Sequence, residues 1–337
     1  MTPRRILVIN VSRIGDTLLA TPAIRALAAA WPEAVVDVLA HPGRMEVLQH
    51  LPFIRKVAAI SKKTAPFRGW HCLPSKPYDL AMVYGYDEAL VSYAMRVAKR
   101  VAAFRQSSAR INSRLAVRVE PAPFQSDHSV RLLLRLPAAL GVRPAGLRLS
   151  YAVTDVERAW AMATLTRDLP VGAAPMVGLQ VASFPTKAYR DWPIESFMEL
   201  CARIRQDWPQ AHFLIFGGSE EQQRTELLKA RLGPAATLYA GHLSLRQTGA
   251  LMSKLHIFIG VDTGPTHLMS AFDIPLVGLY HGFSRSELIA PLEHPCFYPV
   301  DHPLAGPGCS TEAAMADISV DRVWASVQQA LGEHPPA

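Results

Sequence analysis

The chain has 337 residues, of which 50% are hydrophobic and 19% charged, and its formal net charge is +7. This composition excludes an intrinsically disordered protein, and the length exceeds the roughly 250–300 residues at which single cores stop growing, so we expect two domains. No run reaches the ~18 apolar residues that a membrane-spanning helix needs, and the first strand follows the N-terminus without a cleavable signal, which predicts a cytoplasmic protein.

The first half of the chain alternates apolar, strand-like segments with helix-like ones. Strands are predicted at 6–11, 35–40 and 79–85, separated by a helix over 17–34 and by the segment 43–51, and further helices at 87–104 and 128–142. Residues 143–175 are punctuated by proline and glycine, so they are expected to contain the domain junction.

A second alternation of the same kind follows. It predicts strands at 176–183, 212–218, 257–261 and 275–280, with helices at 192–209, 220–233, 244–255 and 265–273. Hydrophobic strands of the parallel type in two successive runs predict an α/β fold with two Rossmann-like, doubly wound domains facing a central cleft. We place these domains at 1–160 and 161–337, with an amphipathic closing helix at 319–331 that could pack back on the N-terminal domain.

A carboxylate stands where the first strand ends and a helix begins. It is Asp16, within the stretch SRIGDTLLATPAI. Open α/β sheets bind ligands at the carboxyl ends of their strands, which makes Asp16 a candidate for chemistry. It can equally be a helix cap that favours the positive helix end, worth roughly 1 kcal/mol. The residues alone leave both interpretations open.

The stretch LHIFIGVDTGPTHLMSAFDIPLVGLY carries the strongest pattern. A buried strand ends at Asp262, Gly264 allows a tight turn, and the first turn of the next helix holds Thr266 and His267. The free amides of that helix, with the hydroxyls of Thr263 and Thr266, would form an anion site of the pyrophosphate-binding kind. The alternative is an ordinary capped turn between a strand and a helix.

Two other strand ends carry polar residues that would lie on the same edge. Ser183, Thr186, Lys187 and Arg190 follow one strand, and cations there would neutralise a leaving diphosphate, unless they are plain surface charges. Glu220 follows another strand, where it could accept hydrogen bonds from a ribose or act only as an acid at a helix start.

Charge and missing motifs narrow the function classes further. The region 62–148 is rich in Lys and Arg, which favours a solvated face, an anionic membrane surface or a phosphorylated acceptor over nucleic acid, because aromatic residues are sparsely interleaved. Phosphate-binding P-loop, glycine-rich dinucleotide, nucleophile-elbow and zinc-protease motifs are missing, as is any Asp-x-Asp pair for a metal. The four scattered cysteines fit a reduced compartment better than a zinc site.

Three stretches, VSRIGDTLLATPAIRALAAAWPEA, SFPTKAYRDWP and GVDTGPTHLMSAFDIPLVGLY, in this order, resemble the heptosyltransferase family of glycosyltransferases (family 9). The resemblance covers nearly the whole chain. It implies the two-Rossmann-domain GT-B architecture, with the acceptor bound by the N-terminal half and the nucleotide sugar by the C-terminal half.

The resemblance also implies roles for particular residues. Asp16 would be the base that takes the acceptor proton in a single inverting displacement, which needs one carboxylate rather than two. Arg13, Gly15 and Thr17 would lie on the acceptor side. The residues that would hold the donor are Asp262, Thr263, Gly264 and His267 at the diphosphate and ribose, Glu220 at the ribose and Leu243 at the adenine.

One position departs from the family pattern. The family often has a diphosphate-contacting Lys two residues before its Trp-Pro pair, where this chain has Arg190, with Lys187 three residues earlier. Arginine keeps the charge but changes the geometry, so either residue, or both, would serve.

The expected function is metal-independent, inverting transfer of a sugar, heptose from ADP-heptose above all, to an anionic lipopolysaccharide inner-core acceptor, with no cofactor. Peripheral contact with the inner membrane follows from that acceptor. The alternatives are a sugar-nucleotide epimerase on the same fold and a non-catalytic nucleotide-sugar-binding protein. A nicotinamide oxidoreductase ranks below them because the glycine fingerprint is missing.

Overall fold

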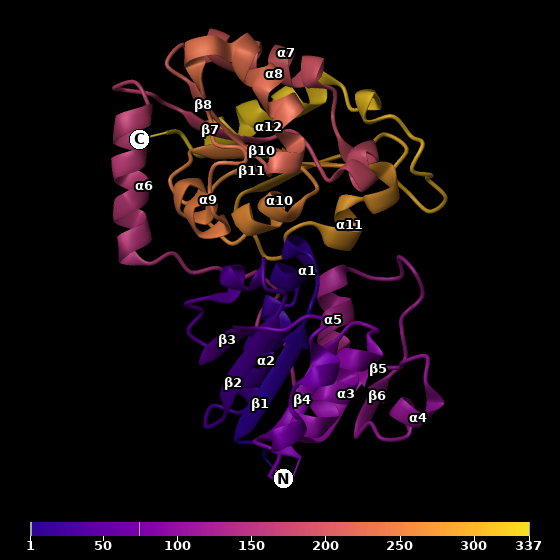
Figure 1. The fold of residues 1–337 in the computed structure, drawn as a ribbon. Helices are drawn as coiled ribbons and strands as arrows, with labels where there is room; N and C mark the ends of the chain where they lie inside the picture. The colour runs from indigo at the N-terminus through magenta and orange to yellow at the C-terminus, as the bar shows by residue number, and fades with distance from the viewer. Residues whose placement is uncertain (1, 74, 337) are drawn as a thin grey trace. The chain divides into compact units, whose positions relative to one another are not determined.

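The computed structural model describes residues 2–73 and 75–336, which form two compact α/β units (Figure 1). The units comprise residues 1–152 and 153–337. The expected boundary between residues 160 and 161 falls inside helix α6 (Asp155–Asp168), which belongs to the second unit. Each unit is described separately below.

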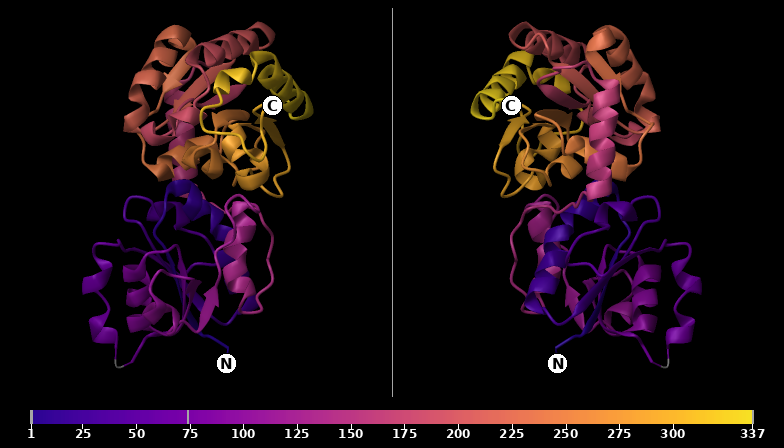
Figure 2. Two further views of the ribbon diagram at one scale, coloured as in Figure 1. Left: turned by 90° about the vertical axis from the view of Figure 1, so that its right-hand side faces the viewer. Right: turned by 90° about the vertical axis from the view of Figure 1, so that its left-hand side faces the viewer.

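The first unit is built on a parallel sheet of six strands in the order β3-β2-β1-β4-β5-β6. The strands are β1 (Arg5–Asn10), β2 (Val35–Ala40), β3 (Lys56–Ala59), β4 (Tyr78–Tyr84), β5 (Ala98–Phe104) and β6 (Val117–Val119). The three predicted strands are confirmed as β1, β2 and β4. They are apolar because helices cover both faces of the sheet, and Ile6 to Ile9 of β1 are fully buried (Figure 2).

The α-helices of this unit are α1 (Ile14–Leu19), α2 (Thr21–Ala30), α3 (Glu88–Val97), α4 (Ala109–Asn112) and α5 (Ser129–Ala138), and its 3-10 turns are η1 (Met45–Leu48), η2 (Ala65–Phe67) and η3 (Trp70–Cys72). The single helix expected over 17–34 is two helices, because the chain bends at Ala20, where the Thr21 hydroxyl donates to the Leu18 carbonyl at 2.6 Å.

One helix prediction in this unit is wrong. The segment 87–104 is not one helix, because α3 passes directly into β5. Strand β5 pairs with β4 on one side and β6 on the other, so its backbone hydrogen bonds are completed within the sheet. The sequence AKRVAAF fits a helix as well as a strand, and pairing with the neighbouring strands decides between them.

The second unit has a parallel six-stranded sheet in the order β12-β11-β10-β7-β8-β9. Its strands are β7 (Met176–Gln180), β8 (His212–Phe216), β9 (Ala236–Leu238), β10 (Ile257–Val261), β11 (Leu276–Tyr280) and β12 (Phe297–Asp301). The four predicted strands are confirmed, and the edge strands β9 and β12 were missed. Numbered from its own first strand, each sheet has the order 3-2-1-4-5-6.

Helices also cover both faces of the second sheet (Figure 2). The α-helices are α6, α7 (Ile194–Asp207), α8 (Gln222–Leu232), α9 (Leu245–Met252), α10 (Gly264–Met269), α11 (Ser286–Ile289) and α12 (Val320–Glu333). Short 3-10 turns are η4 (Pro185–Arg190), η5 (Ser219–Glu221), η6 (Gly233–Ala235), η7 (Gly282–Ser284) and η8 (Met315–Asp317).

The closing helix α12 is part of the core of the second unit. Its buried side chains, among them Val323 and Val327, pack with α7 and with strands β11 and β12. Within its own unit the helix therefore has a covering surface, whereas the expectation that it packs back on the N-terminal domain stays a prediction. The apolar stripe of an amphipathic helix needs one covering surface, and here its own sheet supplies it.

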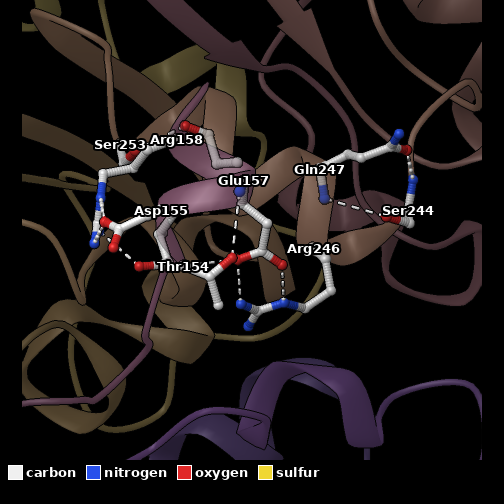
Figure 3. A network of polar contacts seen from close by, with 10 residues as sticks. Thr154, Asp155, Glu157, Arg158, Ser244, Arg246, Gln247 and Ser253 are labelled. Atoms are coloured by element: carbon white, nitrogen blue, oxygen red, sulfur yellow. Dashed lines mark hydrogen bonds and ion pairs between the residues drawn. The ribbon is translucent and has the colours of Figure 1, made fainter. Parts of the chain in front are cut away.

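Helix α6 is fixed to α9 by a pair of charged hydrogen bonds (Figure 3). Arg246 donates from Nε and Nη2 to the two carboxylate oxygens of Glu157 at 2.7 and 2.6 Å. Glu157 also accepts from the backbone amide of Thr154, which caps α6. Burial alone would raise the pKa of Glu157, but the hydrogen bonds from Arg246 and Thr154 lower it to about 2.

Candidate functional site

Polar side chains of the second unit gather where two central strands end. Strands β7 and β10 are neighbours in the sheet although they are far apart in the chain, so the strand order reverses between them. Ligands of open α/β sheets bind at such a point, beyond the carboxyl ends of the strands. Asp262 directly follows β10, and Ser183 and Arg190 follow β7.

Asp262 is the centre of this group. Its carboxylate is 1% exposed, with Arg190 Nη1 2.8 Å from one oxygen and His267 Nε2 3.3 Å from the other. Burial alone would raise the pKa of Asp262, but the hydrogen bond from His267 and the charge of Arg190 outweigh it and lower the pKa. The Asp262 carboxylate thus holds the side chains of Arg190 and His267 in place.

One hydroxyl group beside this cluster is buried without a hydrogen-bond partner among the described residues. It belongs to Thr263, directly before α10. The Ser284 hydroxyl of η7 interacts with the Asp262 carboxylate and helps to lower its pKa. Buried hydroxyls are almost always satisfied, so the Thr263 position favours a ligand that completes it. Thr266, by contrast, donates to the Val261 carbonyl at 2.6 Å and stabilises the turn.

The segment after β7 is held by Asp191, a residue that the sequence analysis did not single out. The amide and hydroxyl of Ser183 donate to Asp191 Oδ1 at 2.7 and 2.6 Å, and the hydroxyl lies 2.7 Å from the Lys187 carbonyl oxygen. Ser183 therefore fixes the shape of η4. Thr186 is exposed within η4.

Lys187 and Arg190 both lie near the ring of Tyr189, with charged groups 5.6 and 5.5 Å from its centroid. The two charges differ in whether an acidic side chain already neutralises them. Arg190 is paired with Asp262, whereas the ammonium of Lys187 has no ion pair within the part of the chain that the structure describes. Lys187 is half-exposed, so it can reach an anion at the strand ends.

The carboxylate that the fold brings in after β8 is Glu221, one residue beyond the predicted Glu220. Glu221 Oε2 accepts from the Gly218 amide at 2.6 Å and lies 3.5 Å from Gln180 Nε2, and burial raises its pKa. Glu220 is exposed on η5. Leu243 is half-buried just before α9. The two adjacent glutamates could not be told apart by spacing, because both fit a strand end.

In the first unit Asp16 is exposed in the first turn of α1, and the residue before this helix, Arg13, makes no capping hydrogen bond through its side chain. Asp16 lines two cavities of this unit, of about 670 and 410 Å³. Both lie beyond the carboxyl ends of strands, and β1 and β4, between which the strand order reverses, border the smaller one.

The larger cavity is basic. Besides Asp16 it is lined by Val11, Ser12, Arg13, His41, Arg44, Ser61, Lys62 and Lys63, from the ends of β1, β2 and β3. Arg44 Nη1 donates to the Ser12 carbonyl at 2.9 Å, which directs the guanidinium toward α1. Burial, with a smaller effect from Arg44, lowers the pKa of His41, so this histidine is neutral near pH 7. Four cations against one carboxylate favour an anionic ligand.

The smaller cavity is aromatic and apolar. Its wall includes Tyr84, Tyr86, Phe104, Leu132 and Leu133, and the rings of Tyr86 and Phe104 are 6.0 Å apart. Aromatic rings beside a few polar groups are typical of sites that bind ring-shaped, partly apolar ligands such as sugars.

Two of the three residues expected on the acceptor side are turned into the protein. Gly15 and Thr17 are buried, and the Thr17 hydroxyl donates to the Arg13 carbonyl at 2.8 Å. Arg13 lines the basic cavity. His41, Arg44, Tyr84 and Tyr86 were missed, although each follows or ends a predicted strand, so the rule that selected Asp16 would also have selected them.

In residues 2–73 and 75–336 no three or more His, Cys, Asp or Glu side chains are grouped so that they could hold a metal ion. None of the helices described is both long and apolar enough to cross a membrane.

Residues 67–295 match the family model of glycosyltransferase family 9 (heptosyltransferase). The chain belongs to glycosyltransferase family 9. As a member of that family it is an enzyme that transfers a glycosyl group. Among its relatives, the lipopolysaccharide core heptosyltransferase OpsX of Haemophilus influenzae is 22% identical over 82% of this chain and 79% of its own.

Solved structures of glycosyltransferases share the fold. A glycosyl transferase family 9 protein from Veillonella parvula matches with a TM-score of 0.85 and 16% identity over 98% of both chains. The E. coli ADP-heptose lps heptosyltransferase II matches with a TM-score of 0.82 and 20% identity, over 98% of this chain and 100% of that chain. The expected fold, two Rossmann-like domains of the GT-B type, is confirmed.

Proposed function

We propose that this family 9 enzyme transfers heptose from ADP-heptose to an anionic sugar of the lipopolysaccharide inner core, in one inverting step that needs no metal. The names of its relatives support this substrate pair, since they include a lipopolysaccharide core heptosyltransferase and an ADP-heptose enzyme. The observation that carries the proposal is the exposed carboxylate of Asp16, which borders both a basic and an aromatic cavity.

The donor would bind to the second unit, at the ends of β7 and β10. The Thr263 hydroxyl, which lacks a partner among the described residues, would donate to the diphosphate, and Lys187 would neutralise the diphosphate as it leaves. Arg190 and His267 would add donors, held in place by Asp262. Glu221 is better placed than Glu220 to receive ribose hydroxyls, because its carboxylate is already oriented by Gly218.

The acceptor would bind to the first unit, with its anionic group in the basic cavity and a sugar ring against Tyr84 and Tyr86. Asp16 would take the proton of the attacking hydroxyl as that oxygen bonds to the anomeric carbon and the ADP oxygen departs. Attack from the face opposite the leaving group inverts the anomeric centre with a single base. A glycolipid acceptor also implies contact with the inner membrane.

The donor half is tested by calorimetric titration of the full chain with ADP, UDP, GDP and NAD in the presence of a chelator. We expect ADP to bind most tightly. Preference for UDP or GDP would still agree with a glycosyltransferase but would exclude ADP-heptose as its donor. Binding of NAD alone would contradict the proposed donor site.

Transfer is then tested with ADP-heptose and a water-soluble, deacylated inner-core saccharide. We expect ADP release coupled one-to-one to a glycosylated product of inverted configuration. An epimerase would change the sugar nucleotide without an acceptor, and a non-catalytic binding protein would release no ADP.

A further inference from the structure

The connection between β3 and β4 presents an exposed apolar surface. Phe67 is 83% exposed, Trp70 57% and Leu73 44%, all within seven residues of chain. Large exposed hydrophobic side chains that lie together mark an interaction surface rather than ordinary scatter. We call residues 62–73 the 62–73 surface.

This exposure is built into the fold. Arg96 of α3 is buried and donates to the Ala65 and Arg68 carbonyls at 2.6 and 2.9 Å, and its guanidinium lies 4.5 Å from the centroid of the Trp70 ring. The Trp70 indole donates to the Pro66 carbonyl at 2.8 Å. The segment is thus fixed against α3, while Phe67 and more than half of the Trp70 side chain stay exposed.

Gly69 brings this segment against α3. Its φ is +80°, in the left-handed region, and a Cβ there would lie 2.9 Å from Val97 Cγ1 and 3.1 Å from the Tyr93 ring. A larger residue would therefore lift the segment from the helix. This close packing does not cover Phe67, whose side chain stays exposed to solvent.

The charged side chains within the 62–73 surface all have one sign. Lys62, Lys63 and Arg68 are exposed, and the sequence has no acidic residue between Ile60 and Pro77. Lys62 is 3.6 Å from Asp87 of the α3 N-terminus, which offsets one of these charges in part. Aromatic side chains surrounded by lysine and arginine fit the interface of a membrane with anionic lipids, where rings enter the headgroup region and cations meet phosphates.

From this arrangement we propose that the 62–73 surface binds an anionic lipid bilayer. An anionic bilayer is chosen as the partner because its charge complements the lysine and arginine side chains of this surface. The position of the surface next to the basic cavity suggests what the binding is for. Lys62 and Lys63 also line the basic cavity beside Asp16, so the surface and the cavity are continuous. A bilayer held here would bring a lipid-linked acceptor to the cavity, a use that rests on the proposed function, whereas the binding itself does not.

The test is sedimentation of the full chain with vesicles of phosphatidylcholine, alone or with about 30% phosphatidylglycerol. We expect binding to the anionic vesicles, weakened by added salt. Phe67→Ser should lower the partition coefficient about tenfold, because the variant has no phenyl ring to transfer from water into the bilayer. The matched control is Leu304→Ser, which removes another exposed hydrophobic side chain, 65% exposed, from the second unit and should change nothing.

A second readout follows the tryptophan itself. The difference between the emission spectra of the wild type and Trp70→Phe should shift to shorter wavelength when anionic vesicles are added. Equal partitioning of Phe67→Ser and the wild type, or no binding of the wild type, would overturn the proposal and leave the surface to a protein partner.

Transfer assays separate this proposal from the proposed function. Phe67→Ser should transfer heptose to a water-soluble saccharide as the wild type does, and lose transfer only to acceptor embedded in vesicles. Vesicle binding without any heptose transfer would contradict the proposed function and leave the lipid surface intact.

Discussion

The guanidinium of Arg190 lies 2.8 Å from the carboxylate of Asp262, although the two residues are 72 positions apart in the chain. Neighbouring strands bring them together, since β7 leads to η4 and Asp262 directly follows β10. This ion pair fixes the position of the Arg190 guanidinium, although Arg190 lies on the short, irregular segment η4. Asp262 also contacts His267, so one buried carboxylate orients two potential donors.

Replacing that carboxylate should loosen both donors at once. We expect Asp262→Asn to weaken ADP binding at least tenfold and to destabilise the second unit by about 3 kcal/mol, because the partly buried Arg190 loses its counter-charge. Calorimetry gives the first effect and thermal unfolding the second. Unchanged ADP affinity in a folded Asp262→Asn protein would contradict the positioning role.

Lys187 is expected to bind the diphosphate directly. Lys187→Gln should weaken ADP binding roughly tenfold with little change in unfolding temperature, since a half-exposed ammonium without an ion pair adds little to stability. Lys254→Gln is the matched control, because Lys254 precedes β10 at the opposite end of the strand from Asp262. If both variants bind ADP like the wild type, the diphosphate contact does not involve Lys187.

Asp16 is expected to act on the chemical step alone. Asp16→Asn should lower kcat by about 10²–10⁴-fold while leaving the Kd for ADP within twofold, because a general base contributes in the transition state. Asp321→Asn serves as control, since Asp321 is also an exposed aspartate in the first turn of a helix. A similar small loss in both variants would mean that Asp16 only favours the positive end of α1.

The basic cavity makes a prediction about KM. Arg44→Gln should raise KM for an anionic acceptor about tenfold, with a much smaller effect on kcat, and the difference from the wild type should shrink as salt screens the charges. Steady-state kinetics at low and high salt measures it, with the exposed Arg231→Gln as control. An effect on kcat at saturating acceptor would place Arg44 in the chemistry instead.

Glu157 should make stability depend on acid pH. Its pKa is lowered to about 2 in the folded protein, below its ordinary value of 4.5, so its contribution is complete above about pH 4.5 and is lost as the pH falls toward 2. We expect Glu157→Gln to lower the free energy of unfolding by about 2 kcal/mol at pH 7 and to flatten its dependence on pH below 4.5.

Denaturant titration at several pH values measures this, with Asp155→Asn as control. Asp155 belongs to the same helix, but its ion pair with Arg158 is solvent-exposed and should matter little (Figure 3). Parallel pH curves for Glu157→Gln and the wild type would show that the pair does not carry the acid sensitivity.

The central strands and their polar ends were predictable because both signals are local. An apolar run followed by Asp262, or by Ser183, needs no knowledge of distant residues. The strand β5 was missed because its pairing with β4 and β6 is not written in AKRVAAF. The edge strands β3, β6 and β9 have only three or four residues, too few for a pattern.

For the candidate site, too, the features encoded locally were predictable and those that depend on distant segments were not. Sequence placed Asp16 and Asp262 near strand ends, but it did not show that the Asp262 carboxylate is buried and paired with Arg190. Which of Glu220 and Glu221 turns inward depends on the Gly218 amide and on Gln180 of a different strand. Such choices rest on contacts between segments far apart in the chain, which spacing alone does not encode.

The identical strand order of the two sheets has a consequence for how this protein can change. The core cluster around β1 draws its residues from 7–103, and the one around β7 and β10 draws its residues from 177–331. Lys187 and Asp16 belong to neither cluster, since Lys187 lies in η4 and Asp16 in the first turn of α1. Natural selection, or a protein engineer, can therefore replace either side chain without replacing a residue of these two clusters.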